Sequence, residues 1–199
     1  AADEPMARVS VGCLAFDRAL LWLEASAKRA ADGFAIEASV LDEMGDAAES
    51  LGCRALADCV SRRRGDFTSR IQLHRWADVV AHNDRGGCWI AMSGMVFDLE
   101  AWLPEHPGGS TIIPAQALNR DSTVFFELYH ASRESFGYLR SFYIGEVLPE
   151  DLRLIPNDAE VASADFMAQL ESFCSPWRLD AEAAAEAALK SHLGGQRKG

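Results

Sequence analysis

Several features that define common protein classes are missing from this 199-residue sequence. No apolar run approaches the ~20 residues that a membrane-spanning helix needs, so we expect a chain that is soluble or peripheral to a membrane. The five cysteines form no Cys-x-x-Cys pair and are odd in number, which argues against a disulfide framework and against a thiolate zinc site. We therefore expect them to be small buried hydrophobes.

Positive charge is also scarce. The chain has 19 Lys and Arg against 30 Asp and Glu, a net charge of −11, and the acidity is spread along the sequence. No segment has the basic character of a nucleic-acid-binding arm, so no nucleic-acid partner is expected. Neither a Ser-His-Asp order nor a glycine-rich phosphate loop occurs, so we predict no catalytic residues.

The chain begins with Ala-Ala-Asp-Glu-Pro rather than with a methionine. Removal of an organellar targeting peptide, mitochondrial or plastid, accounts for such a start, and so does a trimmed chain. Both explanations stay open, and the sequence assigns no compartment.

The outer parts of the chain have the pattern of helices. Residues 9–31 and 36–60 show apolar side chains at helical spacing, with Gly45 and Gly52 as candidate breaks and the charged run 61–66 as a linker. Beyond Pro149, helices are expected from Asn157 to Phe173 and from Ala181 to His192, with Asp180 capping the second. These patterns predict helical extensions over residues 1–69 and 150–199.

Residues 70–149, between these extensions, mix short strands with short helices. Two apolar runs, 88–92 and 95–99, are separated by Ser93-Gly94, which is typical of a hairpin. The run FYIGEV (142–147) has the character of a closing strand. The segment is therefore expected to be a small α+β domain.

Two histidines stand out in this central segment. His106 lies in the string WLPEHPGG (102–109), and His130 ends the aromatic run VFFELYH (124–130). Imidazole is a good ligand for haem iron, and two imidazoles from opposite walls of an apolar crevice would occupy both faces of the iron. Iron held in this way can pass electrons but cannot bind oxygen.

Residues 70–149 resemble the cytochrome b5 haem-binding domain. The resemblance rests on the HPGG string, the second histidine 24 residues later, and the segments VFDL (96–99), DST (121–123) and FYIGEV. It implies a short mixed sheet with two helix pairs that form a crevice for non-covalently bound haem b. It also implies His106 and His130 as axial ligands, with backbone partners for their other ring nitrogens near Gly109 and Phe125 respectively.

The resemblance further implies which residues surround the haem. The crevice is expected to consist of Trp102, Gly108, Gly109, Ile112, Ile113, Phe125, Leu128, Tyr138 and Phe142, with Ile90 and Met92 beneath. An acidic rim that would dock basic redox partners is expected at Glu100, Glu105, Asp121, Glu127 and Glu134.

Three functions remain open, in this order. The leading one is a one-electron carrier with a single b-type haem, docked to partner proteins or to a larger redox complex. The extensions favour an alternative, an accessory or structural subunit of an organellar membrane complex that uses the fold as an interaction module. The third is a haem module separated from an enzyme, because related domains are fused to desaturases, nitrate reductase and sulfite oxidase. The chain contains no histidine-box, flavin or molybdenum-cofactor segment, so we do not expect a complete enzyme of those kinds.

Overall fold

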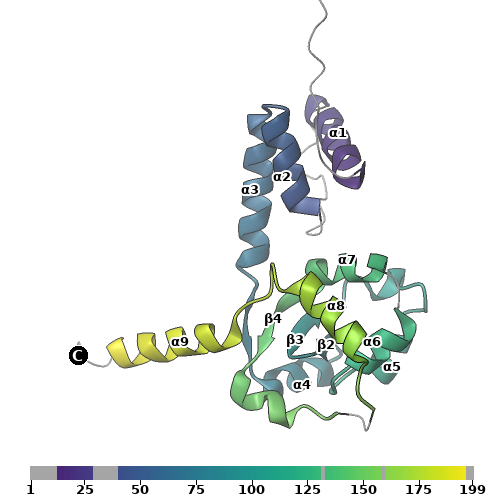
Figure 1. The fold of residues 1–199 in the computed structure, drawn as a ribbon, viewed down its shortest axis with the longest axis vertical. Coiled ribbons are helices and arrows are strands. Elements are labelled where there is room, and N and C mark those ends of the chain that lie inside the picture. The colour runs from purple at the N-terminus through teal and green to yellow at the C-terminus, as the bar shows by residue number, and fades with distance from the viewer. Residues whose placement is uncertain (1–12, 29–39, 131–132, 158–159, 196–199) are drawn as a thin grey trace, which may run out of the picture. The chain divides into compact units, whose positions relative to one another are not determined.

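The computed structural model of the chain describes residues 13–28, 40–130, 133–157 and 160–195 (Figure 1). The contacts within the chain divide it into two compact units, residues 1–69 and residues 70–199. The start of the chain at Ala1 lies outside the described residues. Within the described residues, no helix is both long enough and apolar enough to cross a membrane.

The first unit is helical where it is described. It contains α1 (Cys13–Ala27), α2 (Leu41–Ser50) and α3 (Arg54–Thr68). Gly45 stays inside α2, and the break falls at Gly52, whose φ of 61° is in the left-handed region that glycine adopts without a Cβ clash. The core of the unit contains Ala15, Ala19, Trp22, Leu41, Met44, Leu56 and Val60.

The charged run 61–66 is not a linker, and that prediction was wrong. It forms the second half of α3, because arginine is a good helix former and one exposed glycine costs a helix only about 1 kcal/mol. Arg64 pairs with Asp42 of α2 at 2.9 Å. The run therefore extends the helix and links it to its neighbour.

The second unit is built on a four-stranded sheet. Its strands are β1 (Gln72–His74), β2 (Trp89–Met92), β3 (Met95–Asp98) and β4 (Tyr143–Val147), in the order β1-β4-β3-β2. β1 and β4 are parallel, and the other pairs are antiparallel. The expected hairpin joins β2 to β3, and both of its turn residues, Ser93-Gly94, have positive φ, as a two-residue hairpin turn of type I′ requires.

Gly145 explains how β4 fits between β1 and β3. Its φ is 139°, and a Cβ at this position would lie 1.8 Å from the carbonyl oxygen of Gln72 on β1. The pairing of β3 with β4 also shifts register between Val96 and Phe97. Only glycine allows the backbones of β1 and β4 to approach this closely.

The two faces of the sheet pack against different elements, because successive side chains of a strand point to opposite sides. Ala91 and Val96 lie in a cluster with α4 (Trp76–Asp84). The opposite face contributes to a second, larger cluster, and its members there are Ile90, Met92, Met95 and Phe97.

Four short helices surround the larger cluster. They are η3 (Leu103–Glu105), α5 (Ile112–Gln116), α6 (Thr123–Tyr129) and α7 (Arg133–Phe142). Figure 1 shows α5, α6 and α7 gathered on one side of the strands. A small mixed sheet with short helices around it confirms the predicted α+β class.

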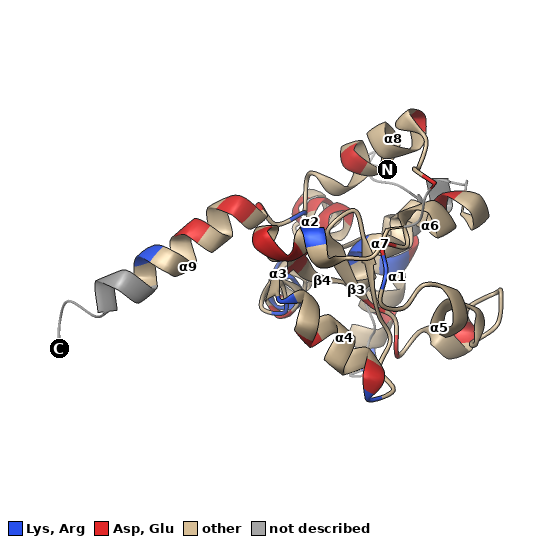
Figure 2. Ribbon diagram, turned by 90° about the horizontal axis from the view of Figure 1, so that it is seen from below, with Lys and Arg blue, Asp and Glu red and all other residues tan. Residues whose placement is uncertain are grey.

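The C-terminal elements belong to the same unit as the sheet. They are η4 (Pro149–Leu154), α8 (Ala164–Cys174) and α9 (Ala181–Gly195). Figure 2 shows acidic positions along both α8 and α9. The apolar side of α8 is nevertheless part of the larger cluster, to which it contributes Phe166, Leu170 and Cys174. Residues after position 149 therefore help to form the core of the unit.

The ends of these helices differ in part from the prediction. The helix expected to begin at Asn157 begins at Ala164 instead, because Ser163 caps it: the Ser163 Oγ accepts a hydrogen bond from the Phe166 N–H at 3.2 Å. α9 begins where it was predicted to, and the Asp180 carboxylate accepts from the Ala183 N–H at 3.0 Å.

A buried ion pair connects the segment after α8 to the sheet. Arg178 donates to both carboxylate oxygens of Glu146 on β4, at 3.0 and 2.9 Å, and to the carbonyl oxygen of Ser93 at 2.8 Å. The Glu146 side chain is 2% exposed. Tyr143 completes the cluster, since its hydroxyl donates to Glu146 at 2.6 Å and accepts from the Leu179 N–H at 3.0 Å.

Candidate functional site

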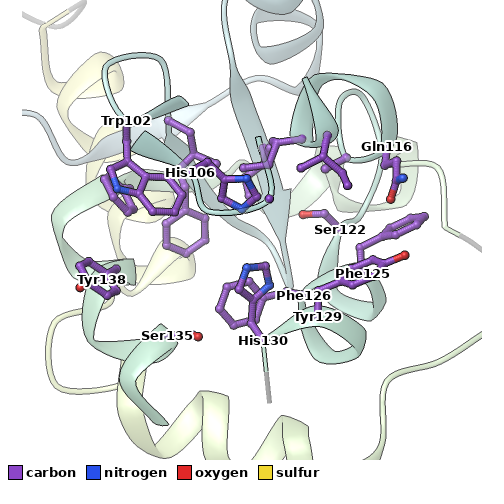
Figure 3. A pocket seen from close by; sticks show the side chains of 18 of the residues that line it. Trp102, His106, Gln116, Ser122, Phe125, Phe126, Tyr129, His130, Ser135 and Tyr138 are labelled. Carbon is purple, nitrogen blue, oxygen red and sulfur yellow. The ribbon is translucent and has the colours of Figure 1, made fainter. Parts of the chain in front are cut away.

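A cavity of about 430 Å³ lies between the short helices of the second unit. Figure 3 shows His106 and His130 facing one another across it, with Trp102 and Tyr138 to one side and Phe125 to the other. Ile90 and Phe97 of the sheet line its floor. The walls are mainly apolar, which is the usual environment of a cofactor that is itself largely apolar.

His106 is held in a fixed orientation by the chain that follows it. The residue follows the last residue of η3, and its Nδ1–H donates to the carbonyl oxygen of Gly109 at 3.1 Å, which leaves Nε2 as the nitrogen that can bind a metal ion. A Cβ on Gly108 would lie 2.8 Å from the imidazole Cε1, and Gly109 has a φ of 92°. The two glycines therefore let the backbone turn beneath the ring, and the partner expected at Gly109 is present.

His130 is held in a different way. It follows the last residue of α6, and its ring stacks on Phe126, with centroids 4.6 Å apart and planes 16° from parallel. Its Nδ1 is buried and has no hydrogen-bond partner among the described residues, so the partner expected at Phe125 is not found. Residues 131 and 132, which follow it, lie outside the described part of the chain.

Burial lowers the pKa of His130, and the nearby imidazole of His106 lowers it further. The carbonyl of Phe126 opposes this effect but does not reverse it. His130 is therefore neutral at neutral pH, and a neutral imidazole nitrogen is the form that binds a metal ion.

The distance between the imidazole rings of His106 and His130 shows whether one metal ion can lie between them. Their centroids are 6.1 Å apart and their planes differ by 46°. Two imidazole–metal bonds of about 2 Å each, plus the reach from each ring centre to its nitrogen, account for this separation.

The residues around the two imidazoles indicate which kind of cofactor fits between them. No group of three His, Cys, Asp or Glu side chains able to hold a metal ion occurs among the described residues. A group that brings four ligands of its own needs only the two imidazoles from the chain. An iron porphyrin is such a group, and it presents apolar faces to apolar walls.

Most of the residues predicted for the crevice line the cavity. Those that do are Trp102, Gly108, Ile112, Ile113, Phe125, Tyr138 and Phe142, together with Ile90 beneath. Gly109 supports His106 from outside the lining. Leu128 is 64% exposed, so its place in the crevice is not found, because it lies on the outer side of α6. Met92 is fully buried in the cluster below and does not reach the cavity.

The sequence interpretation missed several lining residues, among them Leu99, Gln116, Ser122, Phe126, Tyr129, Ser135 and Leu139. Phe126 matters most, because it contacts a histidine of the site directly. A signal was available: residues four apart lie on one face of a helix, so Phe126 is the aromatic neighbour expected for His130.

Comparison with known proteins identifies the domain that contains this cavity. Residues 75–148 match the family described as cytochrome b5-like heme/steroid binding domain. The chain is 33% identical over 89 residues to cytochrome b5 type B of Rattus norvegicus and 38% identical over 78 residues to a cytochrome B5-like protein of Arabidopsis thaliana. It is also 36% identical over 75 residues to Delta(5) fatty acid desaturase A of Dictyostelium discoideum.

Each match covers only part of this chain and part of the relative. The matches to the Rattus norvegicus, Arabidopsis thaliana and Dictyostelium discoideum proteins include 45%, 39% and 37% of this chain, and 60%, 63% and 16% of the relative, respectively. The matched family region lies within residues 70–149 and holds both histidines of the cavity. Residues 75–148 of this chain are therefore a cytochrome b5-like haem-binding domain, from a family of electron-transfer domains.

Proposed function

We propose that the protein is a one-electron carrier in which His106 and His130 are the two axial ligands of a single haem b. The observation that supports this most directly is the pair of imidazoles, 6.1 Å apart across an apolar cavity. When bound, the haem supplies an iron that changes between the ferric and ferrous states. Two histidines that bind the iron in both states would keep the rearrangement during electron transfer small.

The residues of the chain have distinct tasks in this function. His106, fixed by the Gly109 carbonyl, would bind the iron, and its imidazole gains basicity from that hydrogen bond. Trp102 lies edge-on to His106, with centroids 5.1 Å apart, and closes that side of the cavity. The apolar walls would limit the access of water to the iron. Because charges interact more strongly where water is excluded, a nearby charged side chain would have a larger effect on the redox potential.

Three carboxylates of the acidic rim expected for partner docking make contacts within the domain. Glu100 contacts His82, Glu127 bonds to Ser163, and Asp121 accepts from the Thr123 N–H at 2.9 Å. Hydrogen bonds to neutral groups orient these carboxylates but leave their negative charge in place. Glu105 stays exposed at the end of η3. We propose redox partner proteins or a larger complex as the partner class.

The test of axial ligation is a reduced-minus-oxidised absorption spectrum of His106→Ala and His130→Ala. Each variant removes one ligand, so we expect loss of the six-coordinate low-spin spectrum in both. His82→Ala is the matched control: His82 stacks on Trp89 outside the cavity, so the spectrum should be kept. A six-coordinate spectrum that is unchanged in either ligand variant would contradict the assignment.

A second candidate function is favoured by the relatives named as desaturases, such as Delta(5) fatty acid desaturase A. In this role the domain is an electron-donating module for an acyl-lipid desaturase. To test this role, the dithionite-reduced protein is mixed with membranes that contain such an enzyme, and the rate of its reoxidation is measured. We expect the acyl-lipid substrate to increase this rate. The accessory-subunit alternative predicts instead a protein that purifies without haem, does not respond to dithionite and migrates with a larger complex on a native gel.

A further inference from the structure

The two axial ligands proposed above differ in what fixes the plane of the ring. His106 has a hydrogen bond from Nδ1 to a backbone carbonyl. The buried Nδ1 of His130 has no hydrogen bond of comparable geometry among the described residues, and the Phe126 carbonyl is the backbone group that acts on its imidazole. A ring without a hydrogen bond can rotate about its side-chain torsions unless packing prevents it. The contact that restricts it here is the stacked ring of Phe126.

Phe126 is in turn packed against the C-terminal extension. Phe166 of α8 lies 6.2 Å from it between ring centroids, at 50° between planes. Phe136 of α7 contacts both rings, at 5.9 Å from Phe126 and 5.7 Å from Phe166. Phe166 is 7% exposed. The three phenylalanines therefore form one buried cluster behind His130, and one of its members comes from beyond residue 149.

A polar contact joins the same two helices. Glu127, the neighbour of Phe126 on α6, accepts hydrogen bonds from the Ser163 N–H at 2.9 Å and from the Ser163 hydroxyl. The same hydroxyl caps α8 by accepting from the Phe166 N–H. Ser163, which caps α8, is thus bonded to Glu127 of α6, three residues before His130.

The far end of α8 is fixed as well. Arg178, four residues after the helix ends at Cys174, bonds to the buried Glu146 of β4. The helix is therefore held to α6 at its start and to the sheet shortly after its end. Because α8 is fixed at both ends, it can keep the ring of Phe126 in place. A helix with one free end would move together with that ring.

We propose that α8 is the positioning element of the second axial ligand, with Phe166 and Phe126 as positioning residues that set the plane of the His130 imidazole. This inference rests on the proposed function. The contact chain Phe166, Phe126, His130 holds the ring by packing. It assigns a role in the haem site to the extension that follows the matched domain.

The experiment compares Phe166→Ala and Phe166→Leu with Phe173→Ala in the full-length, haem-loaded protein. Phe173 is the matched control, because it lies on the same helix and contacts Phe136 at 5.9 Å but makes no ring contact with Phe126 among those described. Two properties are measured: the electron paramagnetic resonance spectrum of the ferric protein and the rate of haem transfer to apomyoglobin. The g values of low-spin ferric haem depend on the angle between the two imidazole planes, so they report ring orientation rather than overall stability.

The proposal predicts changed g values in both Phe166 variants and, in Phe166→Ala, haem loss about tenfold faster than in the unaltered protein, within the range for residues that orient a metal ligand. Phe173→Ala should keep the original g values. Phe166→Leu keeps most of the volume and so remains informative if the alanine variant does not fold. Unchanged g values and haem loss in both Phe166 variants would overturn the proposal alone. An unaltered protein without a low-spin ferric signal would overturn the axial-ligand assignment, and this inference with it.

Discussion

A histidine outside the haem cavity makes the stability of the second unit depend on pH. His74 on β1 is 5% exposed and donates from Nε2 to the Ile144 carbonyl oxygen at 3.0 Å. Burial lowers its pKa, and the opposing effects of the Ile144 carbonyl and of Asp78 are smaller. The folded unit therefore holds His74 in its neutral form.

The direction of the pH effect follows from proton linkage. Below the ordinary histidine pKa of about 6.5 the unfolded chain binds a proton that folded His74 resists, so the free energy of unfolding falls as the pH falls through this window. The slope from this one group cannot exceed about 1.4 kcal/mol per pH unit. His74→Gln keeps an N–H donor but cannot titrate, so we expect a shallower loss of stability below pH ~6.5.

Urea unfolding followed by the visible haem absorption measures this difference, because the signal reports the second unit and both proteins carry the same haem ligands. The comparison is made at several pH values on either side of the histidine range. Parallel pH profiles for the two proteins would show that His74 does not cause the loss.

The histidine site illustrates what single residues reveal in advance. The two histidines that face the cavity and the glycines after His106 could be predicted because their requirement is local: a ring, a turn and a close backbone approach are all encoded within a few residues. The stacking of Phe126 on His130 could also have been expected, since the two residues lie four apart on one helical face. The packing of Phe136 and Phe166 behind Phe126 could not, because it depends on contacts between residues that are far apart along the chain.

At the scale of elements, the cluster around Glu146 predicts a large effect of one substitution. Arg178→Met removes the cation that faces a carboxylate with 2% exposure, and an unpaired buried charge is costly. We expect a loss of about 3 kcal/mol in the free energy of unfolding. Adding Glu146→Gln to this variant removes the charge that has lost its partner and should recover part of the loss.

Lys190 provides the matched control for this prediction. It pairs with Glu186 at 3.1 Å on the exposed surface of α9, with both side chains more than 70% exposed. Exposed pairs of this kind are worth little, so Lys190→Ala should change stability by less than about 1 kcal/mol. Equal effects of Arg178→Met and Lys190→Ala in denaturant titrations would contradict the structural role of the buried pair.

The elements differed in how well their sequences predicted them. The hairpin at Ser93-Gly94 was found because its turn chemistry is short-range, and the cap of α9 at Asp180 was found for the same reason. The start of α8 was placed too early, since both Asn157 and Ser163 are good caps and only the packing of Phe166 decides between them. The run 61–66 was misassigned because charge was given more weight than helix propensity.

At the scale of the whole molecule, the two units have separate cores. The cluster of the first unit contains only residues before Arg70, and the two clusters of the second contain only residues after it. We therefore expect a protein that begins at Arg70 and ends at Gly199 to keep the haem spectrum and the thermal midpoint of the haem absorption found in the full chain.

A second truncation tests whether the C-terminal extension, unlike the N-terminal one, contributes to the thermal midpoint. A protein of residues 70–149 loses Phe166 and Leu170 from its core and Arg178 from Glu146, so its thermal midpoint should fall by several degrees, about 4–8 °C for each kcal/mol lost. Equal midpoints for the 70–149 and 70–199 proteins would show that the C-terminal extension adds nothing to stability. The sequence could not make this distinction, because the residues that join α8 to the sheet are far apart along the chain.

The parallel pairing of β1 with β4 has a consequence for synthesis on the ribosome. The first strand of the domain, Gln72–His74, waits for its only described sheet neighbour, β4, until Tyr143–Val147 has left the exit tunnel. Contacts of such long sequence separation slow folding and leave an unpaired strand edge accessible in the meantime. Arg178 emerges later still, so Glu146 lacks its ion-pair partner until after β4 has left the tunnel.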